Sequence, residues 1–475
     1  MNNQLLEEIR QSRRMSFAYQ LKLTVGLSLP AIMAQLSTIL MEYIDASMVG
    51  HLGAEASAAI GLVSTSIWLF GGVNNSIVSG FSVQVSHAIG AADFEKARSI
   101  LRQSILSSLC LCLVILSVGA AIAPHLPYWL GGDESIRHDA TLYFLIFILS
   151  LPAWQLNYLG ASMLRSTGNL RLPSMLNVMC CLLDVVFNFV LIFPSRIIDL
   201  GGITIFLPGA GWGVAGAALG SVLAHVVTAS LMLYFLFVRS PELKLWRRPG
   251  SFKPQGRILM KAGRISSPMM FQHIIMCSAQ ICITAIVAPL GIIPIAANSF
   301  AIIAESLCYM PGYGIGDAAT TLVGLCIGAG KRELAKKFAY SAVFLGMSVM
   351  TVMGIIMYAF APFMMSLMTP NYAIMALGAE ILRIEAFAEP MFAASIVSYF
   401  AFVGAGDTFK PFLMNVGSMW IVRITLAALL ASSMGLRGVW IAMCIELCCR
   451  GFIFLFRLHK GWWLPQQEMS KQTIE

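Results

Sequence analysis

Residues 88–97 read AIGAADFEKA, and residues 326–335 read CIGAGKRELA. The two stretches lie 238 residues apart, so each position in one has a counterpart in the other. The same offset pairs Pro152 with Pro390, far outside either stretch. One ungapped offset that holds across most of each half is not expected by chance. The sequence therefore predicts two homologous halves.

Each half contains six apolar runs, and a helical membrane span needs about 20 such residues. The runs lie near residues 22–45, 56–85, 104–127, 140–162, 173–194 and 211–238, and near 264–288, 293–325, 338–362, 382–403, 411–433 and 437–457. Only 11% of the residues are charged, against about 25% in soluble proteins. We therefore expect an all-α polytopic membrane protein with about twelve transmembrane helices, in two six-helix bundles related by an internal parallel repeat.

Lys and Arg are distributed unevenly between the two sides of the predicted membrane. Twenty-six of the 31 lie in the terminal segments or the even-numbered loops. By the positive-inside rule, both termini face the cytoplasm of a multi-pass inner-membrane protein. This topology explains the net charge of +8, so no nucleic-acid partner is expected. The basic segment 239–263 is the predicted cytoplasmic linker between an N-terminal bundle, 1–238, and a C-terminal bundle with its tail, 264–475.

Two carboxylates within spans of the first half are candidates for function, because a charge inside a membrane is costly. Asp45 lies late in the first span, and Asp184 lies in the fifth, on one helix face with Asn177 and Asn188. A carboxylate with amide neighbours can bind a proton or a small hard cation. The repeat counterpart of Asp45 is Ile283, so the scaffold is duplicated and the carboxylate is not. The alternatives are an interfacial carboxylate in contact with water and a polar seam between helices.

A second group of carboxylates lies in the other half. Glu305 is in the eighth span, and Glu385 and Glu389 are four residues apart in the tenth. Glu305 and Glu389 are predicted to line a substrate cavity, whereas Glu385 is expected to pair with Arg383 or to lie near the external surface. Glu446 is expected to form an intrahelical ion pair with the residue four positions later, Arg450.

Polar residues in the first two spans are further candidates for the substrate cavity: Gln35, Trp68 and Asn75. Hydrogen bonding between helices is the alternative role for all three. The patterns GxxxxGKS, GxxxxGKT, HExxH and GxSxG do not occur. We therefore expect neither enzymatic activity nor direct use of ATP, and neither a cofactor nor a metal centre, except that Na⁺ remains possible at Asp45 and Asp184.

Three stretches resemble signatures of the multidrug and toxic compound extrusion (MATE) family: residues 44–53 (IDASMVGHLG), 310–316 (MPGYGIG) and 404–408 (GAGDT). The resemblance implies two six-helix bundles around a V-shaped cavity and drug or metabolite export driven by inward H⁺ or Na⁺. It also implies cation coupling at Asp45 and Asp184, with Ser221 where family members often carry Thr.

The sequence departs from the family pattern near Asp184. Cys180 stands where family members often have Asn, so a hard oxygen ligand is missing and H⁺ is favoured over Na⁺. Glu389 stands where Gln is common. The expected function is therefore secondary active efflux of small organic, cationic compounds by antiport, with Asp45 and Asp184 sharing a partly dehydrated site.

Two other functions remain open. A lipid-linked sugar or polysaccharide flippase would need a cationic cavity, whereas most ionisable residues in these spans are acidic. A membrane-embedded transferase would need a catalytic cluster or a polar domain. A small-molecule substrate, the coupling ion and membrane lipid are the expected partners of a chain that acts as a monomer.

Overall fold

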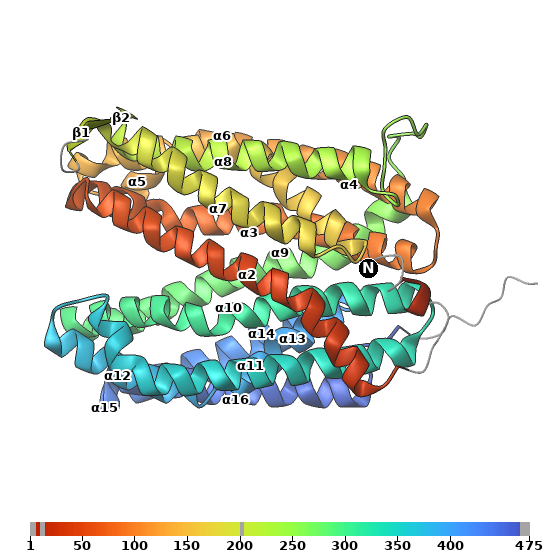
Figure 1. Cartoon of the computed structure of the whole chain (residues 1–475). Coiled ribbons are helices and arrows are strands. Elements are labelled where there is room, and N and C mark those ends of the chain that lie inside the picture. Colours follow the sequence, from red (N-terminus) through yellow and green to blue (C-terminus); the bar gives the residue numbers. More distant parts are fainter. Residues whose placement is uncertain (1–5, 10–14, 200–203, 466–475) are drawn as a thin grey trace, which may run out of the picture. The chain divides into compact units, whose positions relative to one another are not determined.

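The computed structural model describes residues 6–9, 15–199 and 204–465. Within these ranges, eleven helices are long and apolar enough to cross a membrane, and one bent pair of helices makes a twelfth span (Figure 1). The long helices are α2 (Phe17–Gly50), α3 (Ala54–Gly90), α4 (Phe94–Ile122), α6 (Glu134–Ser166), α7 (Arg171–Ile192), α8 (Gly213–Tyr234), α9 (Gly256–Val287), α10 (Ile292–Gly328), α11 (Arg332–Ser366) and α16 (Leu436–Lys460). The eleventh span comprises α14 (Phe409–Gly417), a π-helical segment (Ser418–Ile424) and α15 (Thr425–Met434). The expectation of about twelve spans is confirmed.

The tenth span is not the single helix expected over residues 382–403. It consists of α12 (Tyr372–Ala386) and α13 (Glu389–Ala405), which meet at an angle of 60°. Pro390 explains the break, because its ring clashes with a carbonyl one turn earlier and it has no N–H to donate. In the structure Pro390 lies in the first turn of α13, where neither property interrupts a helix.

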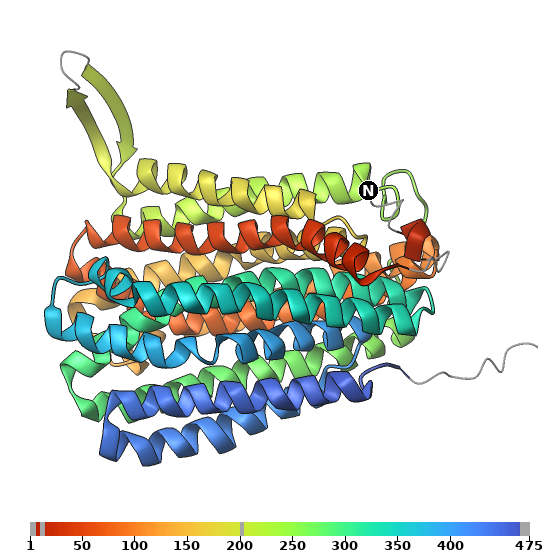
Figure 2. The same cartoon turned by 60° about the horizontal axis from the view of Figure 1, so that its bottom comes forward.

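The connection between α7 and α8 contains two strands that the apolar runs did not predict, β1 (Pro194–Asp199) and β2 (Thr204–Ala210). A further short helix, α5 (Leu126–Trp129), precedes α6. The strands pair in antiparallel register and form a hairpin that extends from the ends of α7 and α8 (Figure 2). Their backbone hydrogen bonds are satisfied by each other, so the connection needs no helix.

The contacts divide the chain into two units. The first unit consists of Pro30–Val85 and Asp93–Cys277, and the second of Ser86–Ala92, Ser278 onward and the described residues up to Leu29. The first unit therefore contains most of every helix from α2 to α9, and the second contains α10 to α16 with the remaining parts of α2, α3 and α9. The division of the sequence itself at 239–263 stays a prediction.

The end of α3 packs on the end of α10 within the second unit. A Cβ atom on Gly90 would lie 2.2 Å from Leu325 O, and one on Gly328 would lie 2.1 Å from His87 O. These two contacts are equivalent under the 238-residue offset. The repeated stretches therefore meet each other backbone to backbone, which explains why both contain a glycine at this position.

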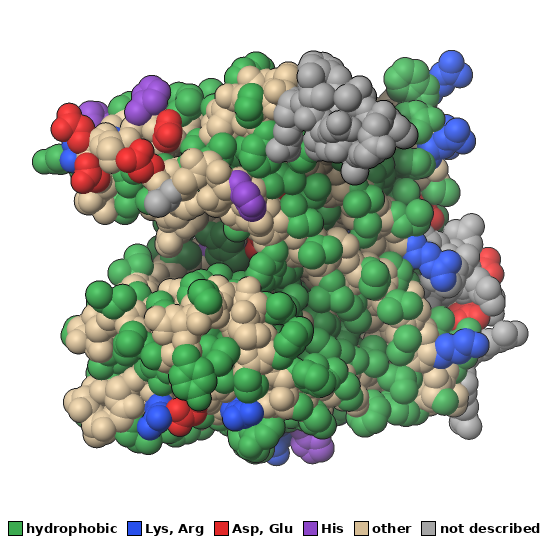
Figure 3. All heavy atoms as spheres, turned by 60° about the vertical axis from the view of Figure 1, so that its left-hand side comes forward, with side chains coloured by type: hydrophobic (Ala, Val, Ile, Leu, Met, Phe, Trp, Pro, Cys, Tyr) green, Lys and Arg blue, Asp and Glu red, His purple; other side chains and the backbone are tan. Residues whose placement is uncertain are grey.

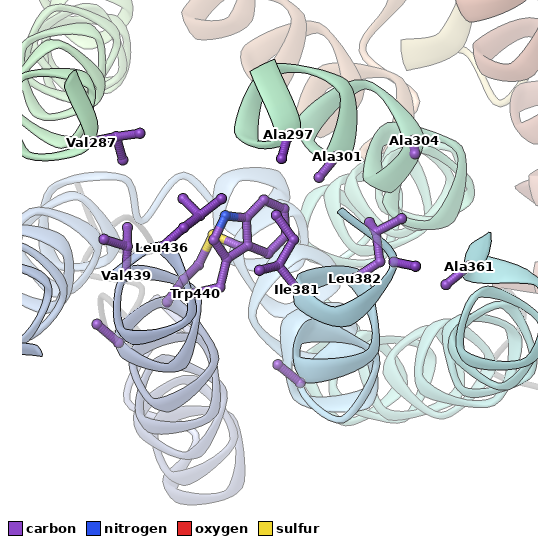
Figure 4. Packing of buried hydrophobic residues seen from close by; sticks show 14 of the residues in the cluster. Val287, Ala297, Ala301, Ala304, Ala361, Ile381, Leu382, Leu436, Val439 and Trp440 are labelled. Carbon is purple, nitrogen blue, oxygen red and sulfur yellow. The ribbon is translucent and has the colours of Figure 1, made fainter. Parts of the chain in front are cut away.

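The largest apolar core of the second unit surrounds Trp440, which is 2% exposed. Figure 4 shows its indole between Ala297 and Ala301 of α10 and Ile381 of α12. The indole Nε1 donates a hydrogen bond to Asn298 Oδ1 at 2.9 Å, so the one polar atom of the ring is satisfied. This core holds α10, α12 and α16 together.

The outer surface of the helices is apolar. Figure 3 shows hydrophobic side chains over most of the visible face. Large side chains such as Leu40 on α2 and Ile355 on α11 are more than 60% exposed. Such surfaces would aggregate in water and are solvated by lipid, so the structure is that of a multi-pass membrane protein.

We predict that Gly90→Ala destabilises the protein by about 1–3 kcal/mol, the usual cost of overpacking a tight contact. The added methyl group would overlap Leu325 O and force α3 away from α10. The free energy of unfolding in detergent micelles is the measurement.

Gly61→Ala is the matched control on the same helix, because a Cβ atom at Gly61 would have nothing within 4 Å. Without a clash, alanine should raise helix stability by up to about 1 kcal/mol. Equal effects at the two glycines would disprove the role of the crossing.

Candidate functional site

Helices α7 and α8 lie side by side in the first unit (Figure 1). A Cβ atom on Gly216 would lie 2.4 Å from Leu191 O, and one on Gly220 would lie 2.0 Å from Asn188 Oδ1. The two glycines are four residues apart and form a small-xxx-small face that admits a neighbouring helix closely. Gly220 therefore leaves the space that the Asn188 side chain occupies.

The Asn188 amide joins two carboxylates from different helices. Its Nδ2 donates to Asp45 Oδ1 of α2 at 2.9 Å and to Asp184 Oδ2 of α7 at 3.0 Å. Asp184 and Asn188 are fully buried, with exposed fractions of 0% and 1%. The expectation that these two share a helix face is confirmed. The structure adds that Asp45, 143 residues away from Asn188, reaches the same amide.

Two hydroxyl groups face this pair of carboxylates. The hydroxyl of Ser221 on α8 faces Asp184 and donates to Ala217 O at 3.3 Å. Tyr143 on α6 faces both Asp45 and Asp184. Sequence reasoning missed Tyr143, because nothing in the apolar pattern of α6 distinguishes it from a packing residue.

The other candidates in this unit do not join the hydrogen-bonded group. Asn177 lies two turns before Asp184 on α7, and in the described part of the chain neither Asn177 nor Gln35 makes a side-chain hydrogen bond. Trp68 is 67% exposed, and the buried Oδ1 of Asn75 has no described partner. Their predicted roles in ion coupling and substrate contact stay predictions.

The glutamates of the other half lie in the second unit. Glu385 does not pair with Arg383, whose Nε donates to Tyr358 O at 3.2 Å. Glu385 is instead fully buried, as is Glu389, and Glu305 is 7% exposed. The role of Glu305 and Glu389 in a substrate cavity stays a prediction.

The ion pair expected in the last span is confirmed. Arg450 Nε lies 3.0 Å from Glu446 Oε1, and Ser418 donates to the same oxygen at 2.6 Å. The carboxylate of Glu446 therefore has a countercharge and a hydrogen-bond donor, as a structural ion pair in a membrane requires.

The Asp45–Asn188–Asp184 group can bind a proton. Its two carboxylates lie beside one amide donor, so a proton on either would remove one negative charge from a buried site. In the described ranges, no three His, Cys, Asp or Glu side chains are arranged to hold a metal ion.

The sequence matches known transporters over nearly its full length. The pattern of the MatE family matches residues 30–190 and 268–429. The "Probable multidrug resistance protein NorM" of Thermotoga maritima is 22% identical over 454 residues, which cover 95% of each protein. "Multidrug resistance protein MdtK" of Edwardsiella ictaluri is 25% identical over 472 residues, which cover 94% of this chain and 96% of that protein.

Solved structures share the fold. An outward-facing multidrug resistance MATE family transporter of the MOP superfamily has a TM-score of 0.85 at 22% identity and covers 93% of this chain and 97% of its own. A MOP superfamily transporter from Pyrococcus furiosus has a TM-score of 0.85 at 21% identity, with 93% and 95% of the two chains covered. At these identities the likeness shows the two-repeat helical architecture alone.

We predict that Asn188→Leu lowers the free energy of unfolding by about 1–3 kcal/mol, because buried carboxylates lose their hydrogen-bond donor. In an Asp184→Leu background the same change should cost less. A double-mutant cycle on thermal unfolding in micelles should give a coupling energy of about 0.5–3 kcal/mol.

Ser230→Ala on α8 is the control, since this exposed hydroxyl bonds only to Val226 O of its own helix. It should change stability by less than about 0.5 kcal/mol. A coupling energy near zero between Asn188 and Asp184 would contradict the amide bridge.

Proposed function

Because the chain belongs to the MatE family, whose pattern matches both of its halves, we propose that it is a secondary active multidrug efflux transporter. It exports small organic, cationic compounds by antiport with H⁺. The observation that carries this proposal is the Asn188 amide, which bridges Asp45 and Asp184 inside a membrane unit. An unduplicated pair of carboxylates in a duplicated scaffold, with Asp184 fully buried and Asp45 half-buried, fits a coupling site better than a part of the architecture.

The coupling would rest on charge. When both carboxylates are ionised, the single amide of Asn188 holds two like charges together. Protonation of either carboxyl removes the repulsion and gives α2 and α7 a different preferred packing. Substrate and proton would then stabilise different states of the protein, which is the thermodynamic condition for antiport.

The arrangement of donors supports H⁺ rather than Na⁺ as the coupling ion. A sodium ion needs several oxygen ligands, as hard cations do. Here the group between the two carboxylates is an N–H donor, and Cys180 offers sulfur one turn before Asp184. Protonation needs no further ligand, so the site as built suits it better.

The proposed contacts for substrate are Gln35, Trp68, Asn75, Glu305 and Glu389. The acidic residues among them suit cationic compounds better than pyrophosphate-linked sugars. The protein would act as a monomer in the inner membrane, with both termini in the cytoplasm because Lys and Arg gather on that side.

We predict that Asp45→Asn abolishes transport driven by a proton gradient, because the amide keeps the shape of the side chain and cannot exchange the proton. The measurement is flux of a fluorescent organic cation in proteoliposomes, with a pH gradient and separately with a Na⁺ gradient. Wild-type flux should follow the pH gradient alone.

Glu134→Gln is the matched control, since it neutralises an exposed carboxylate in the same unit. It should transport like the wild type. Wild-type flux by Asp45→Asn would refute the coupling role, and flux driven only by Na⁺ would reassign the ion. If the folded protein transports no organic cation with either gradient, the efflux proposal itself fails.

A further inference from the structure

The segment between α8 and α9 carries positive charge that nothing in the segment balances. Residues 240–257 contain one acidic residue, Glu242, and five basic residues: Lys244, Arg247, Arg248, Lys253 and Arg257. Glu242 is 6% exposed and accepts a hydrogen bond from the Ser240 hydroxyl. In the described part of the chain, none of the five basic residues forms an ion pair. The segment therefore presents uncompensated positive charge.

The first arm of this segment folds back onto the end of a span. We call residues 240–255 the linker loop. It follows the span that contains α8 and ends at Arg239, and Figure 1 shows it projecting from that end. Phe237 O, in the last turn of the span, accepts a hydrogen bond from Trp246 N at 3.0 Å. Trp246 is therefore held at the level where the span ends.

The start of α4 holds the second arm of the linker loop. Arg102 Nη2 donates to Arg248 O at 3.1 Å and to Pro249 O at 3.3 Å. Gln103 Nε2 donates to Lys253 O at 2.8 Å. Arg102 and Gln103 are 6% and 0% exposed, and both lie directly before the apolar run at residues 104–127. The second arm is therefore also held at the boundary of a span.

Between the two arms, the loop presents charged and aromatic side chains to its surroundings. Arg247 has a φ of 60°, a left-handed conformation that residues other than glycine rarely adopt. The backbone on either side, at Trp246 and Arg248, is hydrogen-bonded to a span, which holds this strained turn in place. Trp246 is 59% exposed and Phe252 is 52% exposed, and Arg247 and Arg248 are exposed as well.

Exposed aromatic rings at this level fit a membrane surface better than water. Tryptophan is amphipathic and gathers where the hydrocarbon core meets the headgroups. A soluble anion or an acidic protein would match the charges and leave both rings in water. The positive-inside rule accounts for the charges alone, and it requires neither exposed rings nor a loop fixed by hydrogen bonds. Rings and basic groups together are the features of a surface that rests on anionic lipid.

We propose that the linker loop is a docking surface for anionic phospholipid headgroups of the adjoining leaflet. Trp246 and Phe252 enter the interface between headgroups and acyl chains. Arg247, Arg248 and Lys253 contact the phosphates, for which guanidinium groups are well-matched donors. The loop thereby ties the ends of α4 and α8 to the lipid. This interaction goes beyond the proposed function, because it needs neither a substrate nor a coupling ion.

Quenching of tryptophan fluorescence by brominated lipid tests the proposal. The protein is reconstituted in vesicles of equal parts phosphatidylcholine and phosphatidylglycerol, in which either one lipid or the other carries the bromine. The signal of Trp246 is the difference between each protein and the same protein with Trp246→Phe. Its quenching should be several-fold stronger when phosphatidylglycerol carries the bromine, since each Lys or Arg near an anionic surface favours contact by about fivefold.

The double variant Arg247→Gln with Arg248→Gln should lose most of that preference. Quenching by brominated phosphatidylcholine should remain, because the backbone hydrogen bonds that place Trp246 are unchanged, and it shows that the loop is still folded. The matched control is Lys337→Gln with Lys410→Gln, which removes two exposed positive charges from the second unit. It should keep the wild-type preference.

Salt gives an independent test of the electrostatic part. At an ionic strength on the order of 1 M the preference for phosphatidylglycerol should largely disappear, because the Debye length falls to about 3 Å. Equal quenching by the two brominated lipids in the wild type, or no quenching by either, overturns the docking surface. An equal loss of preference in the control pair overturns it too, since the attraction would then come from overall charge. Flux in the transport assay is a separate measurement that none of these results decides.

Discussion

The close crossing of α3 and α10 at Gly90 and Gly328 brings the two copies of the repeated motif together within the second unit. In lipid, apolar helices gain little from contact with each other, because the solvent is as apolar as they are. Stability then comes from close approach, and two glycines allow the closest approach. The two contacts are equivalent under the sequence offset. In each of them, a glycine of one repeat lies against the backbone of the other repeat. A duplicated motif is what such a reciprocal contact requires.

On this symmetric scaffold the acidic residues are placed asymmetrically. The repeat counterparts of Asp45 and Asp184 are Ile283 and Val422. The counterpart of Glu389 is likewise apolar, Leu151. Each unit therefore contains its own group of buried carboxyls at positions that the other unit leaves apolar. The duplicated scaffold explains how the helices are held, and the acidic residues are not part of what is duplicated.

The acidic residues in these spans differ in how fully their hydrogen bonds are satisfied. Glu446 has a countercharge and a donor, as expected of a group that only holds helices together. Asp184 has one oxygen bonded to Asn188 and the other without a described partner. Among the described residues, the carboxylate oxygens of Glu385 and Glu389 have no hydrogen-bond donor. A buried carboxylate that has few hydrogen-bond donors and no countercharge depends more on a reversibly bound ligand for its stability. A proton is the smallest such ligand.

The sequence by itself determined the number of spans, the two-fold repeat and the individual acidic candidates, because each depends on local rules. A span needs a run of apolar residues, and a charge within it is conspicuous. Only the tertiary structure decided which candidates meet. The Asn188 bridge to Asp45 depends on how α2 and α7 are rotated and on the space that Gly220 leaves. The positions of the buried Glu385 and Glu389 depend on the 60° break of the tenth span. Rotation and crossing of helices result from packing between distant segments, which apolar periodicity along one helix does not encode.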